Sequence, residues 1–150
     1  MTDKKGKSAS IMILGSILLI IVHFTFTFTS ITPYIPMALL GIGFSLIPAA
    51  MWPSVAKIVD TNKIGTAYGF IFSVQNFGLW LFPMLIGYIL DKSNPGVTQD
   101  LVEQGKASFN YTNPILMLMF LGILGLVFAI LLKRDDKTSG YGLEKPNIAE

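Results

Sequence analysis

Three long stretches of this 150-residue chain carry no Asp, Glu, Lys or Arg; they cover residues 11–56, 64–90 and 107–132. A helix needs about 20 apolar residues to cross ~30 Å of hydrocarbon, so the first stretch is long enough for two crossings and each of the others for one. The chain as a whole is 52% hydrophobic and 13% charged, a composition typical of membrane proteins. We therefore predict an all-α membrane protein with four transmembrane helices.

The spans are predicted over residues 11–29, 34–59, 65–90 and 114–132. Residues 23–29 alternate apolar and polar side chains, which also fits a strand, but a membrane barrel needs many such segments and the rest of the chain has none. Residues 1–10 are expected to be a polar loop remnant. Residues 133–150 are polar and are expected to form a disordered tail.

The third span has two different faces when its residues are wound at 100° per residue. One half is apolar, and the other carries small, polar and amphipathic side chains: Gly65, Tyr68, Gly69, Gln75, Asn76. An amide that faces lipid without a partner is costly, so Gln75 and Asn76 should face protein or a water-filled cavity. Either this helix lines a substrate path, or the two amides bridge neighbouring helices.

The second span combines a narrow face of small residues, including Gly41, with a single large ring at Trp52. Pro48 and Pro53 lie inside it, and each removes one backbone hydrogen bond, so we expect a kink or break between them. Broken helices often mark transport sites, although many membrane helices carry a proline kink without a site nearby. Small residues and prolines predict packing or hinge positions at Gly41, Pro48, Pro53, Gly65 and Gly69.

The basic residues are unevenly distributed between the two ends of the predicted spans. Nine Lys and Arg residues lie in the two tails and in the loop after the second span, whereas the opposite side has only Lys92 and Lys106. Basic residues favour the cytoplasmic side. Both termini are therefore predicted to be cytoplasmic.

Several function classes have little support in the composition. The chain has no Cys, one His and a net charge of +2, so we expect no metal site, no cofactor and no nucleic-acid partner. Ser, His and carboxylates do not cluster within the spans, so an enzyme is not expected. His23 lies in the first span, where a lone His is either a proton-sensing group or a partner in an interhelical hydrogen bond.

Two motifs carry a family resemblance. Residues 3–8 (DKKGKS) resemble the D-[KR]-x-G-[KR]-[KR] loop signature of the major facilitator superfamily, with Ser8 in place of the last basic residue. Residues 51–91 contain W-P-S-V-A followed by I-G-T-A-Y-G-F and S-V-Q-N-F-G-L. This run is similar to helices 10 and 11 of the superfamily branch that includes lysosomal dipeptide transporters.

The resemblance implies that the four spans are helices 9–12 of a twelve-helix major facilitator fold, a C-terminal fragment that is expected to be inactive alone. It further implies alternating-access transport of dipeptides or similar small organic solutes. The substrate path is then expected at Trp52, Tyr68, Gln75 and Asn76. Expected partners are the lipid bilayer, a small-molecule substrate and the missing N-terminal helices, in a bacterial cytoplasmic or a lysosomal membrane. The alternative is a self-contained four-helix protein that acts as an oligomer or binds a partner.

Overall fold

The computed structural model describes residues 6–146, and within them every regular element is a helix. In chain order these are α2 (Ser8–Phe28), α3 (Tyr34–Ile58), the 3-10 turn η1 (Thr61–Lys63), α4 (Ile64–Ser93), α5 (Gln99–Glu103) and α6 (Thr112–Ser139). The helices α2, α3, α4 and α6 are long and apolar enough to cross a membrane. The predicted all-α fold with four candidate spans is confirmed.

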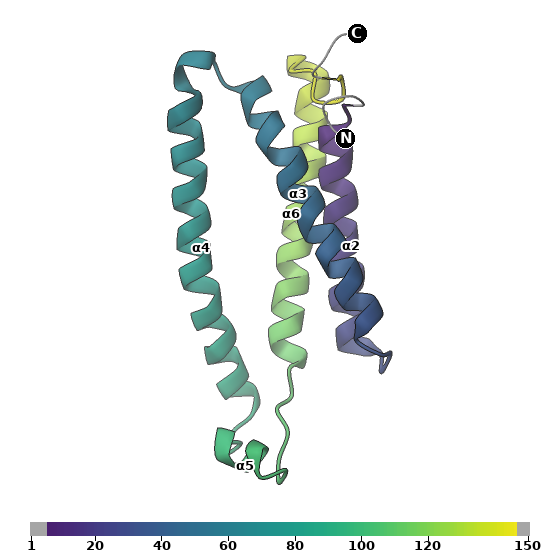
Figure 1. Ribbon diagram of the computed structural model, residues 1–150, viewed down its shortest axis with the longest axis vertical. Helices are drawn as coiled ribbons and strands as arrows, with labels where there is room; N and C mark the ends of the chain where they lie inside the picture. Colours follow the sequence, from purple (N-terminus) through teal and green to yellow (C-terminus); the bar gives the residue numbers. More distant parts are fainter. Residues whose placement is uncertain (1–5, 147–150) are drawn as a thin grey trace.

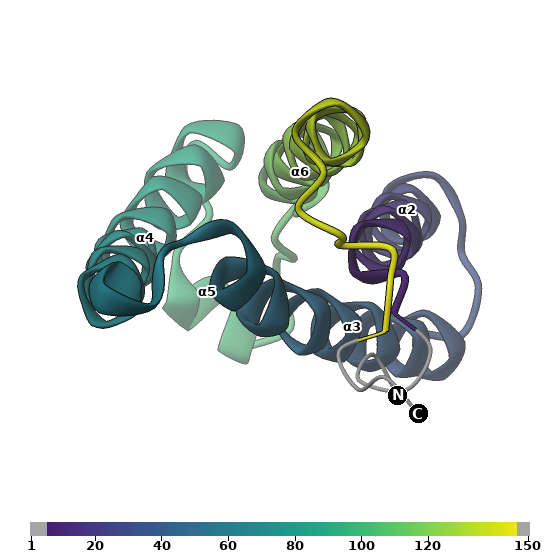
Figure 2. The same ribbon diagram turned by 90° about the horizontal axis from the view of Figure 1, so that it is seen from above.

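Three of the four long helices form a packed group, and the fourth lies beside it. Helix α2 packs closely against both α3 and α6, whereas α4 makes only sparse contacts with α3 and α6 (Figures 1 and 2). None of the residues in α4 is buried. The core is therefore a three-helix group centred on α2, with α4 beside it.

Small residues bring the backbones of α2 and α3 together. A Cβ atom added at Gly15 would lie 3.2 Å from the Gly43 carbonyl oxygen and 2.8 Å from the Ile47 side chain. One added at Gly43 would lie 3.4 Å from the Gly15 carbonyl oxygen. In lipid, helices associate through close van der Waals contact rather than through the hydrophobic effect. The absence of a side chain at both positions is therefore what permits this contact.

A small buried cluster joins the same three helices. It consists of Met12 from α2, Ala50 from α3 and Ala129 from α6. The buried hydroxyls of Ser16 and Ser54 donate to the carbonyl oxygens four residues earlier, at 3.0 and 2.8 Å. These two hydroxyls thus find partners within their own helices, which removes the cost of burying them.

The structure differs from the sequence expectations at two places in the helices. Helix α3 runs unbroken from Tyr34 to Ile58 with Pro48 and Pro53 inside it, so of the expected kink or break, the break does not occur. Helix α6 continues to Ser139 and ends at Gly140, which has a φ of 74°. Charged residues end the apolar span, but Lys and Arg are good helix formers, and a left-handed glycine is a common helix terminator.

Residues 1–5 of the expected loop remnant and residues 147–150 of the expected tail lie outside the described residues. The parts of both segments that are described are ordered. Helix α2 already begins at Ser8, and Leu143 is fully buried. The backbone nitrogen of Ser8 donates to the carbonyl oxygen of Leu143 at 3.0 Å. Residues 140–146 are thus packed against the start of α2.

The orientation in the membrane can be tested because both termini lie at one end of the bundle and α5 lies at the other (Figure 1). The chain has no Cys, so single cysteines report unambiguously. We expect a membrane-impermeant maleimide to label Lys106→Cys in intact cells and to label Lys63→Cys only after permeabilisation, because the side with fewer basic residues should face outward. The reverse labelling pattern would place the termini outside.

A second test concerns the contact between Gly15 and Gly43. We expect Gly43→Leu to destabilise the chain by about 1–3 kcal/mol, because the added side chain overpacks the α2–α3 contact. The measurement is thermal unfolding in detergent micelles, followed by the loss of helical circular dichroism. Gly41→Leu is the matched control, since a Cβ at Gly41 would meet no atom within 4 Å. Equal effects of the two substitutions would contradict this packing.

Candidate functional site

A cavity of about 390 Å³ lies between α3 and α4. Its lining residues come mainly from these two helices, with Leu19 from α2: Leu19, Phe44, Ile47, Pro48, Met51, Trp52, Ile71, Val74, Gln75. Helix α4 makes few contacts with the rest of the bundle. The cavity therefore lies between the packed group of α2, α3 and α6 and the long helix that is least fixed by contacts.

Aromatic contacts around Trp52 join α3 to α4. The ring centroid of Trp52 lies 5.4 Å from that of Tyr68, in an edge-on arrangement at 62°, and 4.8 Å from that of Phe72. The Tyr68 hydroxyl donates to the backbone carbonyl oxygen of Trp52 at 3.1 Å. Aromatic pairs at these distances are favourable, so these three residues fix the relative position of the two helices at one end of the cavity.

The two neighbouring amides of α4 have different surroundings. Gln75 lines the cavity, whereas the Asn76 amide nitrogen donates to the Phe72 carbonyl oxygen within α4 at 2.8 Å. Gln75 is the only amide among the described residues that line the cavity, and none of those residues is charged. The site can therefore receive an uncharged group and offer it one side-chain donor and acceptor.

His23 lies at a separate cavity of about 350 Å³, between α2, α3 and α6. Leu19, Phe44 and Ile47 line both cavities, so the two are neighbours. The Nδ1 atom of His23 lies 2.6 Å from the Leu19 carbonyl oxygen, and this atom must therefore carry the hydrogen. The hydrogen bond is within α2 rather than between helices, and a role for His23 as a proton-sensing group stays a prediction.

Comparison with known proteins identifies the family. The Major Facilitator Superfamily matches residues 1–147 of the chain. The chain belongs to this superfamily. Its members are transporters rather than enzymes, and the four apolar helices make this chain a multi-pass membrane protein.

Relatives of this major facilitator chain are similar over a region of 91 residues, which is 61% of the chain. The lysosomal dipeptide transporter MFSD1 is 41% identical in Danio rerio, 40% in Homo sapiens and 42% in Mus musculus. The aligned region covers only 20% of each of these relatives, so the chain spans about a fifth of the length of the relatives it matches. No solved structure matches the chain.

Of the site residues predicted from the sequence, the structure brings Trp52, Tyr68 and Gln75 together at one cavity and its aromatic edge. Asn76 lies beside them along α4 but is not part of the cavity lining. Phe72 was missed. It lies four residues after Tyr68 and three before Gln75, a spacing that places all three on one helix face and could have indicated it.

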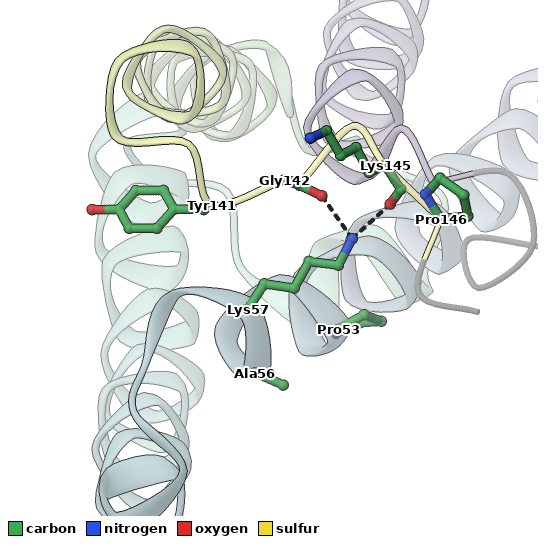
Figure 3. Close-up of a pocket in the computed structure, with 7 residues that line it drawn as sticks. All are labelled: Pro53, Ala56, Lys57, Tyr141, Gly142, Lys145 and Pro146. Carbon is green, nitrogen blue, oxygen red and sulfur yellow. Dashed lines mark hydrogen bonds between the residues drawn. The ribbon is translucent and has the colours of Figure 1, made fainter. Parts of the chain in front are cut away.

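The predicted packing and hinge positions of this facilitator chain differ in what surrounds them: the two prolines line cavities, and the three glycines have open space beside them. Pro48 lines the α3–α4 cavity, whereas Pro53 lines another cavity at the end of the bundle where the termini lie (Figure 3). A Cβ at Gly41, Gly65 or Gly69 would meet no atom within 4 Å. Their predicted role in helix packing therefore has no counterpart among residues 6–146, and it stays a prediction for contacts with other segments.

Metal chemistry finds no support in the part of the chain that the structure describes. Residues 6–146 contain no group of three His, Cys, Asp or Glu side chains that could hold a metal ion. The candidate site is an uncharged cavity lined mainly by aliphatic side chains, together with the rings of Phe44 and Trp52 and the Gln75 amide.

The hydrogen bond between Tyr68 and Trp52 can be tested separately from the ring contact. Tyr68→Phe keeps the ring but removes the hydroxyl, so we expect a loss of about 1 kcal/mol of unfolding free energy, measured as a lower thermal midpoint in detergent. Tyr88→Phe is the control, because Tyr88 is 61% exposed on the same helix. An unchanged midpoint for Tyr68→Phe would show that this bond does not join α3 to α4.

Proposed function

We propose that this chain forms part of a secondary transporter that moves small organic solutes by alternating access, with the α3–α4 cavity on the substrate path. One observation carries the proposal: an aromatic cluster and the Gln75 amide border a cavity between two apolar helices. Ligand sites in transporters typically lie between helices near the membrane midplane, with few polar groups. Membership of the Major Facilitator Superfamily supports the same function.

The proposed substrates are dipeptides or similar small solutes. The relatives at about 40% identity are named as dipeptide transporters, and the motifs from Trp52 to Leu79 carry the sequence resemblance to that branch. The cavity lining is uncharged, so it suits the apolar or amide part of a dipeptide. The charged termini of a peptide need partners of opposite charge, which we place on other helices of the transporter.

Those other helices are the proposed partners of this chain. None of the residues in α4 is buried, although Gln75 and Asn76 are amides that lipid would not satisfy. Further helices of the same transporter would cover this face and complete the substrate path. We propose that both termini are cytoplasmic, in a bacterial cytoplasmic or a lysosomal membrane.

The uncovered α4 also supports a second candidate, in which copies of this chain cover α4 for one another or a separate partner does so. Native mass spectrometry of the purified chain separates the two proposals. Masses at multiples of 16.4 kDa would favour the self-contained oligomer. A monomer that gains order only when the remaining transporter helices are present would favour the first proposal.

A transport assay tests the site directly. The chain would replace the corresponding segment of Danio rerio MFSD1, and dipeptide uptake would be measured in proteoliposomes. We expect Trp52→Ala and Gln75→Ala each to lower uptake about tenfold, because each removes an interaction worth about 1.4 kcal/mol at the proposed path. The amount of protein in the membrane should not change.

Ser73→Ala is the matched control for this assay. Ser73 is exposed on the same helix, outside the cavity lining, and its hydroxyl donates to the Gly69 carbonyl oxygen at 2.9 Å. Normal uptake by both the Trp52 and the Gln75 variants would contradict the site. A chimera that is correctly inserted but inactive, beside an active parent transporter, would contradict the proposed substrate class.

A further inference from the structure

The segment after α6, residues 140–146, turns back across the end of the bundle where the termini lie; we call it the strap. Gly140 and Gly142 have φ values of 74° and 77°, a backbone region that glycine adopts at little cost. These two glycines let the chain reverse direction directly after α6. Figure 3 shows the strap running past the last turns of α3.

The strap is anchored firmly to α2 and α6. Leu143 has no exposed surface, and its backbone nitrogen donates to an Asp136 carboxylate oxygen at 2.9 Å. Its carbonyl oxygen accepts a hydrogen bond from the Ser8 nitrogen at 3.0 Å. The Glu144 carboxylate accepts two more, from the backbone nitrogen and the hydroxyl of Ser10, at 2.9 and 2.8 Å. The Lys7 nitrogen also donates to the Glu144 carbonyl oxygen at 3.3 Å. A buried apolar side chain and five hydrogen bonds therefore hold the strap on this side.

The strap is joined to α3 in a different way, by hydrogen bonds from a single lysine side chain. The Lys57 ammonium donates to the carbonyl oxygens of Gly142 and Lys145 at 2.8 and 2.6 Å (Figure 3). Beside this contact lies a cavity of about 520 Å³, which is lined by Pro53 and Ala56 of α3 together with strap residues. One flexible, charged side chain thus bridges the space between the end of α3 and the strap.

We propose that the strap is a latch: it stays attached to α2 and α6, and the Lys57 contact reversibly holds or releases the end of α3. Release has a low net cost, because a freed ammonium regains hydrogen bonds to water. Helix α3 also carries Pro48 and Trp52, which line the cavity shared with α4. The latch therefore sets the position of the last turn of α3, directly beyond the part of the helix that lines this cavity. The proposal rests on these contacts alone and does not depend on the transported substrate.

The latch can be tested by distance measurements on the full 150-residue chain in lipid nanodiscs. The chain has no native Cys, so spin labels can be attached at Leu14→Cys in α2 and Ile58→Cys at the end of α3, both of which are exposed. We expect one narrow distance distribution in this parent. Lys57→Gln should broaden the distribution and add a population at longer distance, because the charged contact with the strap is lost.

Lys63→Gln is the matched control for Lys57→Gln. Lys63 follows the same helix, and its only ion pair in the described residues is with Asp60 at 4.0 Å, with both side chains more than 75% exposed. We expect its distance distribution to equal that of the parent. A chain that ends at Ser139 lacks the strap and should show the same broadening as Lys57→Gln.

Hydrogen exchange distinguishes a latch from a general loss of structure. In Lys57→Gln, the backbone amides of Ser8 and Leu143 should exchange within about twofold of their parent rates, because the anchor on α2 and α6 is intact. Unprotected amides at both positions would show that the whole strap has detached, which contradicts a latch hinged on α2 and α6. An unchanged distance distribution in Lys57→Gln also overturns the proposal, and this holds even if the shortened chain fails to fold.

Discussion

The close contact between Gly15 and Gly43 is the interaction on which the arrangement of the helices depends. Lipid gives helices no hydrophobic reason to associate, so three apolar helices stay together only where their surfaces fit at short range. Helix α2 meets that requirement on two sides, against α3 at Gly15 and against α6, where a Cβ at Gly122 would lie 3.2 Å from Ile20. The α2 helix thus determines where both of its neighbours lie.

Helix α4 has no contact of this kind with the packed group. In the described chain its glycines at 65, 69 and 87 face open space, and its main link to α3 is the aromatic cluster around Trp52. At its other end Ser93 accepts a hydrogen bond from Asn113 of α6 at 2.9 Å. Between its two ends α4 has few contacts with α3, so it can change its distance from α3 at low cost. A substrate path needs such freedom, whereas the packed group around α2 supplies a fixed wall for it.

The sequence predicts well the features that depend on local pattern. Uncharged stretches identify the four spans, and helical spacing places Tyr68 and Gln75 on one face, which is why both lie close to Trp52. Which helices pack against each other does not follow from local sequence pattern. Small residues in α3 indicate Gly41, yet Gly43, two residues on, is the one that contacts α2, and periodicity cannot say which face meets which neighbour. The strap was missed because Ser10 and Glu144 are 134 positions apart.

The latch and the cavity are linked because both depend on α3. Helix α3 is held in its middle at Gly43, borders the cavity at Trp52 and meets the strap at Lys57. At 1.5 Å per residue, Trp52 lies ~14 Å and Lys57 ~21 Å along the helix from the Gly43 contact. Between those two positions Ser54 is buried, so α3 stays packed against its neighbours up to that residue and the proposed latch acts on the turn beyond it. The two hydrogen bonds from Lys57 to the strap are made within that last turn, where the proposed latch can hold or release the end of α3 without disturbing the packed residues before it.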